Sequence, residues 1–288
     1  MIHENILFGY DFDDETNTLI GKELIQDYGF FSTFTLMLTS IMVVYKKFNI
    51  LPENIDGKYL LRKLKKNKNL DMYSHFFHID REMKISFDTD IPVPFSPDDH
   101  HTLYSEKYIK YYEPFFKKYF NLNKCVLEKI EELKMKYNFD SDNSISVIFR
   151  DSDKWTDFGG FNYISAGAYV RKCNEIKSKE PNLKVLIQSE NSGVVKSFKE
   201  FFNSIFFNET ELGNTSEIYP PIPIDDEKKL MWSEYYVASL WIHSKSKYVI
   251  TYTGNSSFFV YLNRGTTKNL IQEITFTKNY NEFFVENN

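Results

Sequence analysis

The sequence predicts an α/β protein whose second half is a parallel β-sheet covered by helices on both faces. Two observations predict this class. From residue 144 onward, short apolar runs rich in β-branched residues alternate with helical patterns, as is typical of βαβ units. The chain has 288 residues, 42% of them hydrophobic, which is enough for one large or two medium domains. We expect one domain over residues 1–140 and a second over 141–288, divided at the polar turn 138–143.

The first half contains one strongly predicted helix. Strand pieces are expected at 18–20 and 24–25, and Gly29 precedes a helix over 30–48 whose apolar residues run nearly all round, as in a buried helix. The proline-rich segment 51–99 is expected to form short elements and one wall of a cleft, with a helix at 58–66 and a strand at 83–87. Helical patterns return over 104–137 and are interrupted at Asn121 and Asn123.

The second half alternates regularly between the two kinds of element. The expected strands cover 145–149, 184–188, 248–252 and 270–276, and the expected helices cover 165–177, 193–206, 226–244 and 258–262.

Charge and cysteine content exclude several classes of protein. The net charge is −5, whereas a protein that binds duplex nucleic acid usually carries a dominant basic face. Cys125 and Cys173 show neither metal-binding spacing nor a disulfide framework. The first residues lack a secretory signal, and the longest apolar stretch, 30–44, is too short and too polar for a membrane span. We expect no membrane span, and a cytoplasmic protein of a microbe or of a virus-infected host cell.

Polar side chains follow three successive predicted strands. Arg150 follows the first, Ser189 and Glu190 follow the second, and Asn255, Ser256 and Ser257 follow the third. Helix caps would explain each group separately. Carboxyl ends of parallel strands meet at one edge of a sheet, however, where α/β proteins bind ligands. An arginine there offers a planar fork of donors that suits a phosphate, and Asp153 is placed to orient it. The sequence therefore predicts a site for an anionic, nucleotide-type ligand.

Other chemical motifs are weak or absent. His100 and His101 have no third ligand at a convincing spacing, so no metal site is expected. The sequence contains no phosphate-binding Gly-Lys-Ser/Thr loop, no Gly-x-Ser-x-Gly elbow and no His-Glu-x-x-His motif. An unrelated α/β hydrolase or phosphatase is a third possibility, but this sequence contains no nucleophile motif for such an enzyme.

The stretch 148–154, Ile-Phe-Arg-Asp-Ser-Asp-Lys, resembles a motif of the GDP-fucose-dependent fucosyltransferase superfamily, which includes α-1,2, α-1,6 and protein O-fucosyltransferases. In that family a strand ends in His-x-Arg-Arg-x-Asp, and Arg150 and Asp153 match its first arginine and its aspartate. Segments 183–191 and 240–262 are similar to later family elements, and Gly29-Phe30-Phe31 is similar to a glycine-containing loop near the amino terminus. The resemblance implies a GT-B-like fold of two Rossmann-like domains, each with a parallel sheet flanked by helices.

The resemblance also implies an activity. It implies transfer of a sugar, fucose from GDP-fucose first of all, to a glycan or other hydroxyl acceptor, with inversion and without a metal or a cofactor. Arg150 and Asp153 are the implied catalytic residues. The implied donor-binding residues are Gly29, Phe30, Phe31, Arg150, Ser189, Glu190, Ser239, Asn255, Ser256 and Ser257. The general base is left open among Asp27, Asp98, Asp99 and Asp157.

The chain departs from the family motif at important positions. Ile148 stands where the family has histidine, and Asp151 stands where it has the second arginine. These changes motivate an alternative, a catalytically degenerate relative that binds a nucleotide sugar or a glycan without transferring it.

Overall fold

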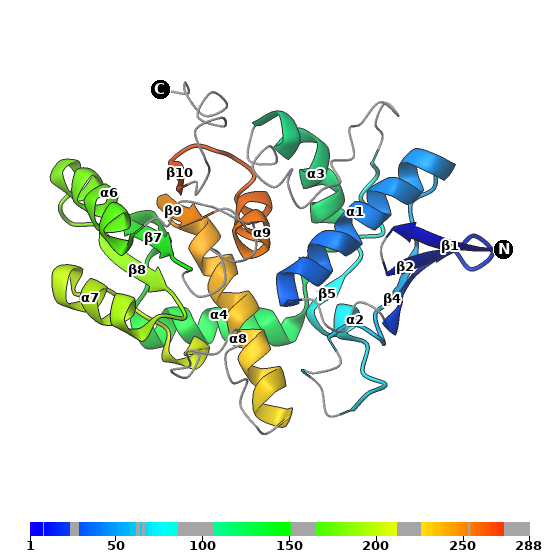
Figure 1. The fold of residues 1–288 in the computed structure, drawn as a ribbon, viewed down its shortest axis with the longest axis horizontal. Helices are drawn as coiled ribbons and strands as arrows, with labels where there is room; N and C mark the ends of the chain where they lie inside the picture. The colour runs from blue at the N-terminus through cyan, green and yellow to red at the C-terminus, as the bar shows by residue number, and fades with distance from the viewer. Residues whose placement is uncertain are drawn as a thin grey trace.

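Two β-sheets lie at opposite ends of the molecule, with helices packed between them (Figure 1). The computed structural model describes residues 1–7, 9–23, 29–61, 64, 67–85, 106–150, 165–211, 226–252 and 254–273. The α/β class expected from the sequence is confirmed.

The first sheet is mixed. Its strands β1 (Ile2–Leu7), β2 (Tyr10–Asp13), β3 (Thr18–Gly21) and β4 (Asn54–Asp56) lie in the order β1-β2-β3-β4. The first two pairings are antiparallel and the last is parallel. The antiparallel part follows from a tight connection, because Leu7 pairs with Tyr10 across a turn in which Gly9 has a φ of 82°. The hairpin β1–β2 was not predicted from the sequence.

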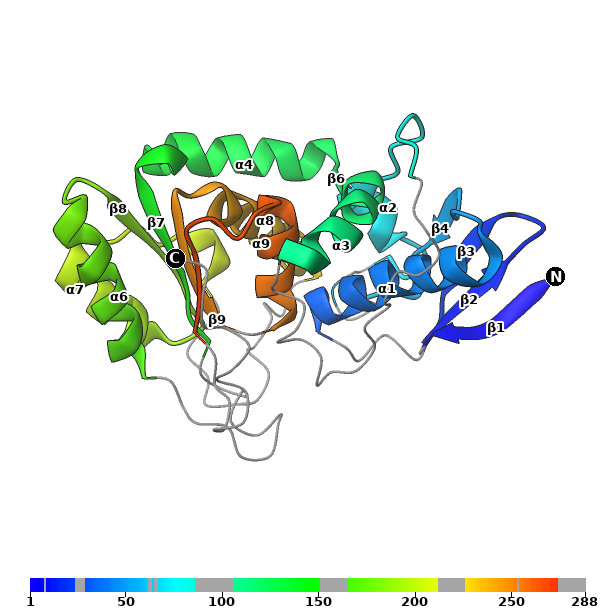
Figure 2. The same cartoon turned by 90° about the horizontal axis from the view of Figure 1, so that it is seen from above.

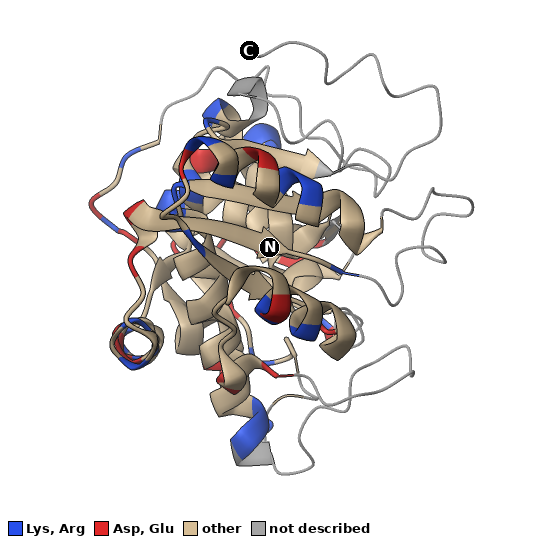
Figure 3. Cartoon of the chain, turned by 90° about the vertical axis from the view of Figure 1, so that its left-hand side faces the viewer, with Lys and Arg blue, Asp and Glu red and all other residues tan. Residues whose placement is uncertain are grey.

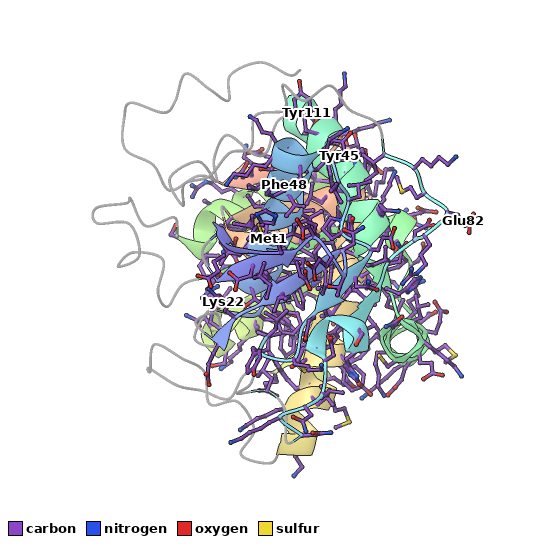
Figure 4. The ribbon with its side chains drawn as sticks, turned by 90° about the vertical axis from the view of Figure 1, so that its right-hand side faces the viewer. Met1, Lys22, Tyr45, Phe48, Glu82 and Tyr111 are labelled. Atoms are coloured by element: carbon purple, nitrogen blue, oxygen red, sulfur yellow. The ribbon has the colours of Figure 1, made fainter. Side chains whose placement is uncertain are left out.

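Helix α1 (Phe30–Phe48) covers this sheet, as Figure 2 shows. Phe48, at its carboxyl end, packs on His3 of β1 and Phe12 of β2, with ring centroids 4.5 Å and 5.7 Å apart. Figure 4 shows this end of the molecule, with Phe48 and Met1 labelled. The helix has the bounds that the sequence predicted.

The expected helix over 58–66 does not form in the residues that the structure describes. The chain turns instead: Leu61 has a φ of 53°, Leu60 N–H donates to the Gly57 carbonyl, and Leu64 N–H donates to the Leu61 carbonyl. Leu60 and Leu61 are buried, so tertiary packing outweighs the helical pattern of the lysines. Residues 83–85 form no strand, and the rest of the strand expected at 83–87 lies outside the described residues.

Helices and two short strands connect the two sheets. Helix α2 (Met72–Phe76), strand β5 (Phe77–His78), helix α3 (Glu106–Tyr119), strand β6 (Asn121–Leu122) and helix α4 (Lys124–Tyr137) follow in chain order. Strands β5 and β6 pair antiparallel. The interruption predicted between the two helices is confirmed, and it is the short strand β6.

The second sheet is parallel throughout. A short 3₁₀ turn, η4 (Ser141–Asn143), leads into strand β7 (Ser144–Ile148). Strands β8 (Lys184–Gln188), β9 (Tyr248–Tyr252) and β10 (Leu270–Glu273) follow. Their order is β10-β9-β7-β8, with every pair parallel.

Helices cover both faces of this sheet, as predicted (Figure 2). Helices α6 (Ala166–Lys179) and α7 (Ser192–Phe202) pack on one face, against a cluster that includes Ile145 and Val147. Helices α8 (Asp226–Lys245) and α9 (Asn255–Arg264) pack on the other, in a cluster that includes Ile148. The two faces alternate along β7 because successive side chains of a strand point to opposite sides.

The apolar core continues from the first half of the chain into the second. One cluster contains Phe31 and Phe34 of α1 together with Phe258 and Phe259 of α9. A boundary at residue 140 lies between α4 and η4, and the division into two domains stays a prediction.

The distribution of charged residues on the surface agrees with the small net charge of −5. On the side drawn in Figure 3, acidic and basic residues alternate along the outer helices. Among the described residues, no helix is long and apolar enough to cross a membrane.

His243 is a fully buried residue of α8. Its Nδ1 atom pairs with the Ser146 hydroxyl of β7, and its ring lies 6.5 Å from that of Phe207. Burial lowers the pKa of His243 to about 3, because the charged imidazolium would lose its hydration. The folded protein therefore holds this histidine neutral.

The unfolding free energy should decrease as the pH falls from about 6.5 to about 3. In this range His243 takes up a proton in the unfolded chain but stays neutral in the folded chain. The expected contribution is up to about 1.4 kcal/mol per pH unit. Urea denaturation at a series of pH values should show a shallower dependence in His243→Gln than in the wild type, whatever the offset between the two curves. Equal slopes would contradict the buried neutral state.

Candidate functional site

The strand order of the second sheet predicts where a ligand binds. The chain passes from β7 outward to β8 and then returns to the other side of β7 to form β9. The reversal lies between β7 and β9. In open α/β sheets, ligands bind outside the carboxyl ends of the strands at such a reversal.

Arg150 lies at this point. It follows β7 directly after Phe149, which is buried against Tyr169 with ring centroids 5.1 Å apart. The Phe149 N–H also donates to the Gln188 carbonyl, 2.9 Å away. The backbone before Arg150 is thus held by packing and by hydrogen bonding, while its side chain is half-buried.

Ser189 and Glu190 follow β8 at the same edge. Ser189 is buried and its hydroxyl accepts a hydrogen bond from the Asn191 N–H at 3.0 Å. Asn191 in turn caps α7, accepting from the Val194 N–H at 3.1 Å. A local turn just before the cap therefore accounts for the hydroxyl of Ser189, whereas Glu190 is half-exposed.

The amino terminus of α9 follows β9. A side chain at Gly254 would place its Cβ 2.5 Å from the Tyr252 ring, so the close approach requires glycine. Ser256 pairs with the Tyr252 hydroxyl, and Ser257 pairs with Thr251 Oγ1 at 2.6 Å. Both serines are buried, while Asn255 is half-buried.

The amino terminus of α1 meets that of α9. Asn255 Nδ2 donates to Ser32 Oγ at 2.8 Å, which joins two helix ends 223 residues apart in the chain. Gly29 is exposed in an extended conformation, and a Cβ there would find ordinary space. The conformation of the chain therefore does not require a glycine at position 29.

Tyr236 of α8 links these segments. Its ring lies 5.4 Å from that of Phe31 and 6.4 Å from that of Phe30. Burial is the main cause that raises the pKa of the Tyr236 phenol, with Tyr252 and Glu190 adding to it and the Arg150 guanidinium opposing it. The phenol therefore lies within electrostatic reach of Arg150, which follows β7, and of Glu190, which follows β8.

The structure thus brings together the amino terminus of α1 and the residues that follow β7, β8 and β9. Tyr236 and Ser32 were not singled out in the sequence. The available signal was their position next to residues that had been singled out. Tyr236 precedes Ser239 by three residues, and Ser32 follows Phe31 directly.

Ser239 lies apart from solvent. It is fully buried on α8, and its hydroxyl donates to Gln188 Oε1 at 3.3 Å. The same oxygen also accepts a hydrogen bond from Thr210 Oγ1 at 2.9 Å. Its predicted contact with the donor stays a prediction. Five other residues lie outside the described part of the chain: Asp153 and the four candidates for the general base, Asp27, Asp98, Asp99 and Asp157.

A surface pocket of about 330 Å³ lies at the opposite end of α9. Its walls include Phe116 and Lys117 of α3, Trp241 and Lys245 of α8, and Asn263 of α9. None of the predicted site residues lines this pocket.

The fold and site together define an α/β protein with a candidate anion site at the sheet reversal. No protein-family model and no curated protein matches the chain. A similar solved structure is the fucosyltransferase NodZ from Bradyrhizobium, with 13% sequence identity and a TM-score of 0.47, over 77% of this chain and 87% of that one. A likeness at this level supports no conclusion about the activity of this chain.

The hydrogen bond between Asn255 and Ser32 should stabilise the meeting of α1 and α9. Asn255→Ala and Ser32→Ala should each lower the unfolding free energy by about 1 kcal/mol. Because both remove the same bond, the double variant should lose less than the sum. Chemical denaturation of the four proteins gives the coupling energy, and strictly additive losses would show that the bond contributes nothing.

Proposed function

We propose that this chain is a glycosyltransferase that takes its sugar from a nucleotide donor, with GDP-fucose as the first candidate. The observation that carries the proposal is the position of Arg150, at the carboxyl end of β7 and beside the reversal of strand order. The motif resemblance of residues 148–154 concerns this same arginine.

Arg150 would bind the diphosphate of the donor. A guanidinium makes two parallel hydrogen bonds to phosphate oxygens, and it stabilises the negative charge that develops on the leaving group. In this role it supplies the positive charge that a metal ion provides in other transferases.

The surrounding residues support the placement of a donor. Glu190 and Asn255 are half-exposed at the same edge and offer hydrogen-bonding groups. The exposed Gly29 and half-buried Phe30 lie at the amino terminus of α1, where backbone N–H groups and the helix dipole favour anions. The expectation that the segment 51–99 forms the acceptor side stays a prediction, because residues 86–99 lie outside the described part of the chain.

A specific observation favours the alternative of a binding protein without transferase activity. Ile148, at the position of the motif histidine, is 3% exposed and belongs to the apolar core. Isoleucine has no titratable proton and no hydrogen-bonding group, so this position lacks the polar chemistry that the motif histidine would bring. We therefore treat a nucleotide-sugar-binding relative as the second candidate.

Calorimetry with GDP, GDP-fucose and UDP should separate these readings. We expect GDP and GDP-fucose to bind more tightly than UDP, and GDP-fucose to be consumed when a suitable glycan acceptor is present. Tight binding of GDP-fucose with neither hydrolysis nor transfer would favour the second candidate. Absence of binding by all three nucleotides would contradict both.

Replacing Arg150 with alanine should weaken the binding of GDP and reduce turnover by a factor of about 100 or more, which corresponds to about 3 kcal/mol of transition-state stabilisation. Arg171→Ala, in the exposed surface of α6, is the matched control and should behave like the wild type. Circular dichroism checks that both variants are folded. Turnover like that of the wild type in Arg150→Ala would exclude the proposed role.

A further inference from the structure

Three side chains of types that can bind a metal converge from three separate helices. They are His75 of α2, Cys125 in the first turn of α4, and Glu234 of α8, and their ligand atoms all lie within 4.8 Å of one another. His75 Nε2 lies 2.9 Å from Glu234 Oε1. All three residues are half-buried.

The backbone around this cluster is held in place by Asn123. Its side-chain amide donates to the carbonyl groups of Ser74 at 2.5 Å and Phe77 at 3.0 Å, and its backbone N–H donates to the Phe76 carbonyl at 2.9 Å. These bonds join the end of α2 to the start of α4. They place His75 beside Cys125, whose thiol lies 3.2 Å from the His75 carbonyl oxygen.

The Glu234 carboxylate has no permanently charged partner among the described residues. The side chain of Glu234 is 13% exposed, and among the described residues its one ion-pair partner is His75, which is charged only when protonated. A dication would compensate both the carboxylate and a thiolate, which is the form of cysteine that binds metals.

We propose that His75, Cys125 and Glu234 bind one divalent transition-metal ion of the zinc class, with water in the fourth position. Bonds of about 2.0–2.3 Å from zinc to nitrogen, oxygen and sulfur place tetrahedral ligand atoms roughly 3.2–3.8 Å apart. The separation of His75 from Glu234 must therefore open by a few tenths of an ångström, while the cluster as a whole already lies within reach. A set with sulfur and imidazole selects zinc or cobalt over magnesium and calcium, which prefer oxygen.

The competing explanation is a purely structural pair, in which His75 and Glu234 join α2 to α8 and Cys125 merely donates to a carbonyl group. The two explanations differ in what the thiol does when a metal is offered. None of its three residues is among the predicted donor-binding residues, and its test does not depend on transferase activity.

Titration of the chelator-treated protein with Co²⁺ tests the proposal. Binding by Cys125 should give a saturable thiolate-to-cobalt charge-transfer band with one equivalent of metal, and Zn²⁺ but not Mg²⁺ should abolish the band. The band should be absent from Cys125→Ser and present in Cys173→Ala, which changes the other free cysteine, buried on α6. A wild-type protein without a saturable band, or a band that persists in Cys125→Ser, would overturn the proposal.

Glu234→Gln provides a second variant that keeps a hydrogen-bonding group opposite His75. It should remain folded in chelator and bind Co²⁺ about tenfold more weakly or worse, since even residues that only orient metal ligands contribute about that much. His3→Gln, which changes a histidine of β1 outside the cluster, should bind like the wild type. Unchanged affinity in folded Glu234→Gln would exclude the carboxylate as a ligand.

Discussion

The packing of α9 is the constraint on which the arrangement of the molecule depends. Phe259 lies against Phe31 of α1 and Phe116 of α3, with ring centroids 4.9 Å and 5.4 Å apart, and the neighbouring Phe258 lies 5.4 Å from Tyr112 of α3. Aromatic contacts of this kind combine a large buried area with a preferred geometry. They hold a helix of the second sheet against helices of the first half, and Asn255 and Ser32 join the amino termini of α9 and α1.

Much of the second half could be predicted from local patterns. Strands β8 and β9 have the bounds that their apolar runs indicated, because buried parallel strands are continuously apolar. Helix α9 was predicted too short, since Asn255, Ser256 and Ser257 read as a polar turn yet form its first turn. The hairpin β1–β2 is local, and Gly9 in its turn was its main sequence signal. The turns around Leu61 instead depend on burial against distant residues, which a single sequence does not display.

The candidate site also contains some residues that could be predicted from the sequence and others that could not. The residues after β7, β8 and β9 could be predicted because parallel strands end at one edge. Which of them face solvent could not be predicted, and Ser189, Ser256 and Ser257 use their hydroxyl groups in hydrogen bonds within the protein. The position of Tyr236 depends on the rotation of α8 about its axis. Polar and apolar residues are mixed around that helix, so its pattern gives no preferred face.

Helix α8 has a length of about 30 Å for its 20 residues. Along that length Glu234 points to the histidine–cysteine cluster, Tyr236 to the sheet edge, Trp241 to the surface pocket and His243 to the core. A single rigid rod therefore spans four environments, and a register shift of one residue would displace all of them together. Insertions and deletions within this helix should consequently be far less tolerated than exchanges of individual side chains.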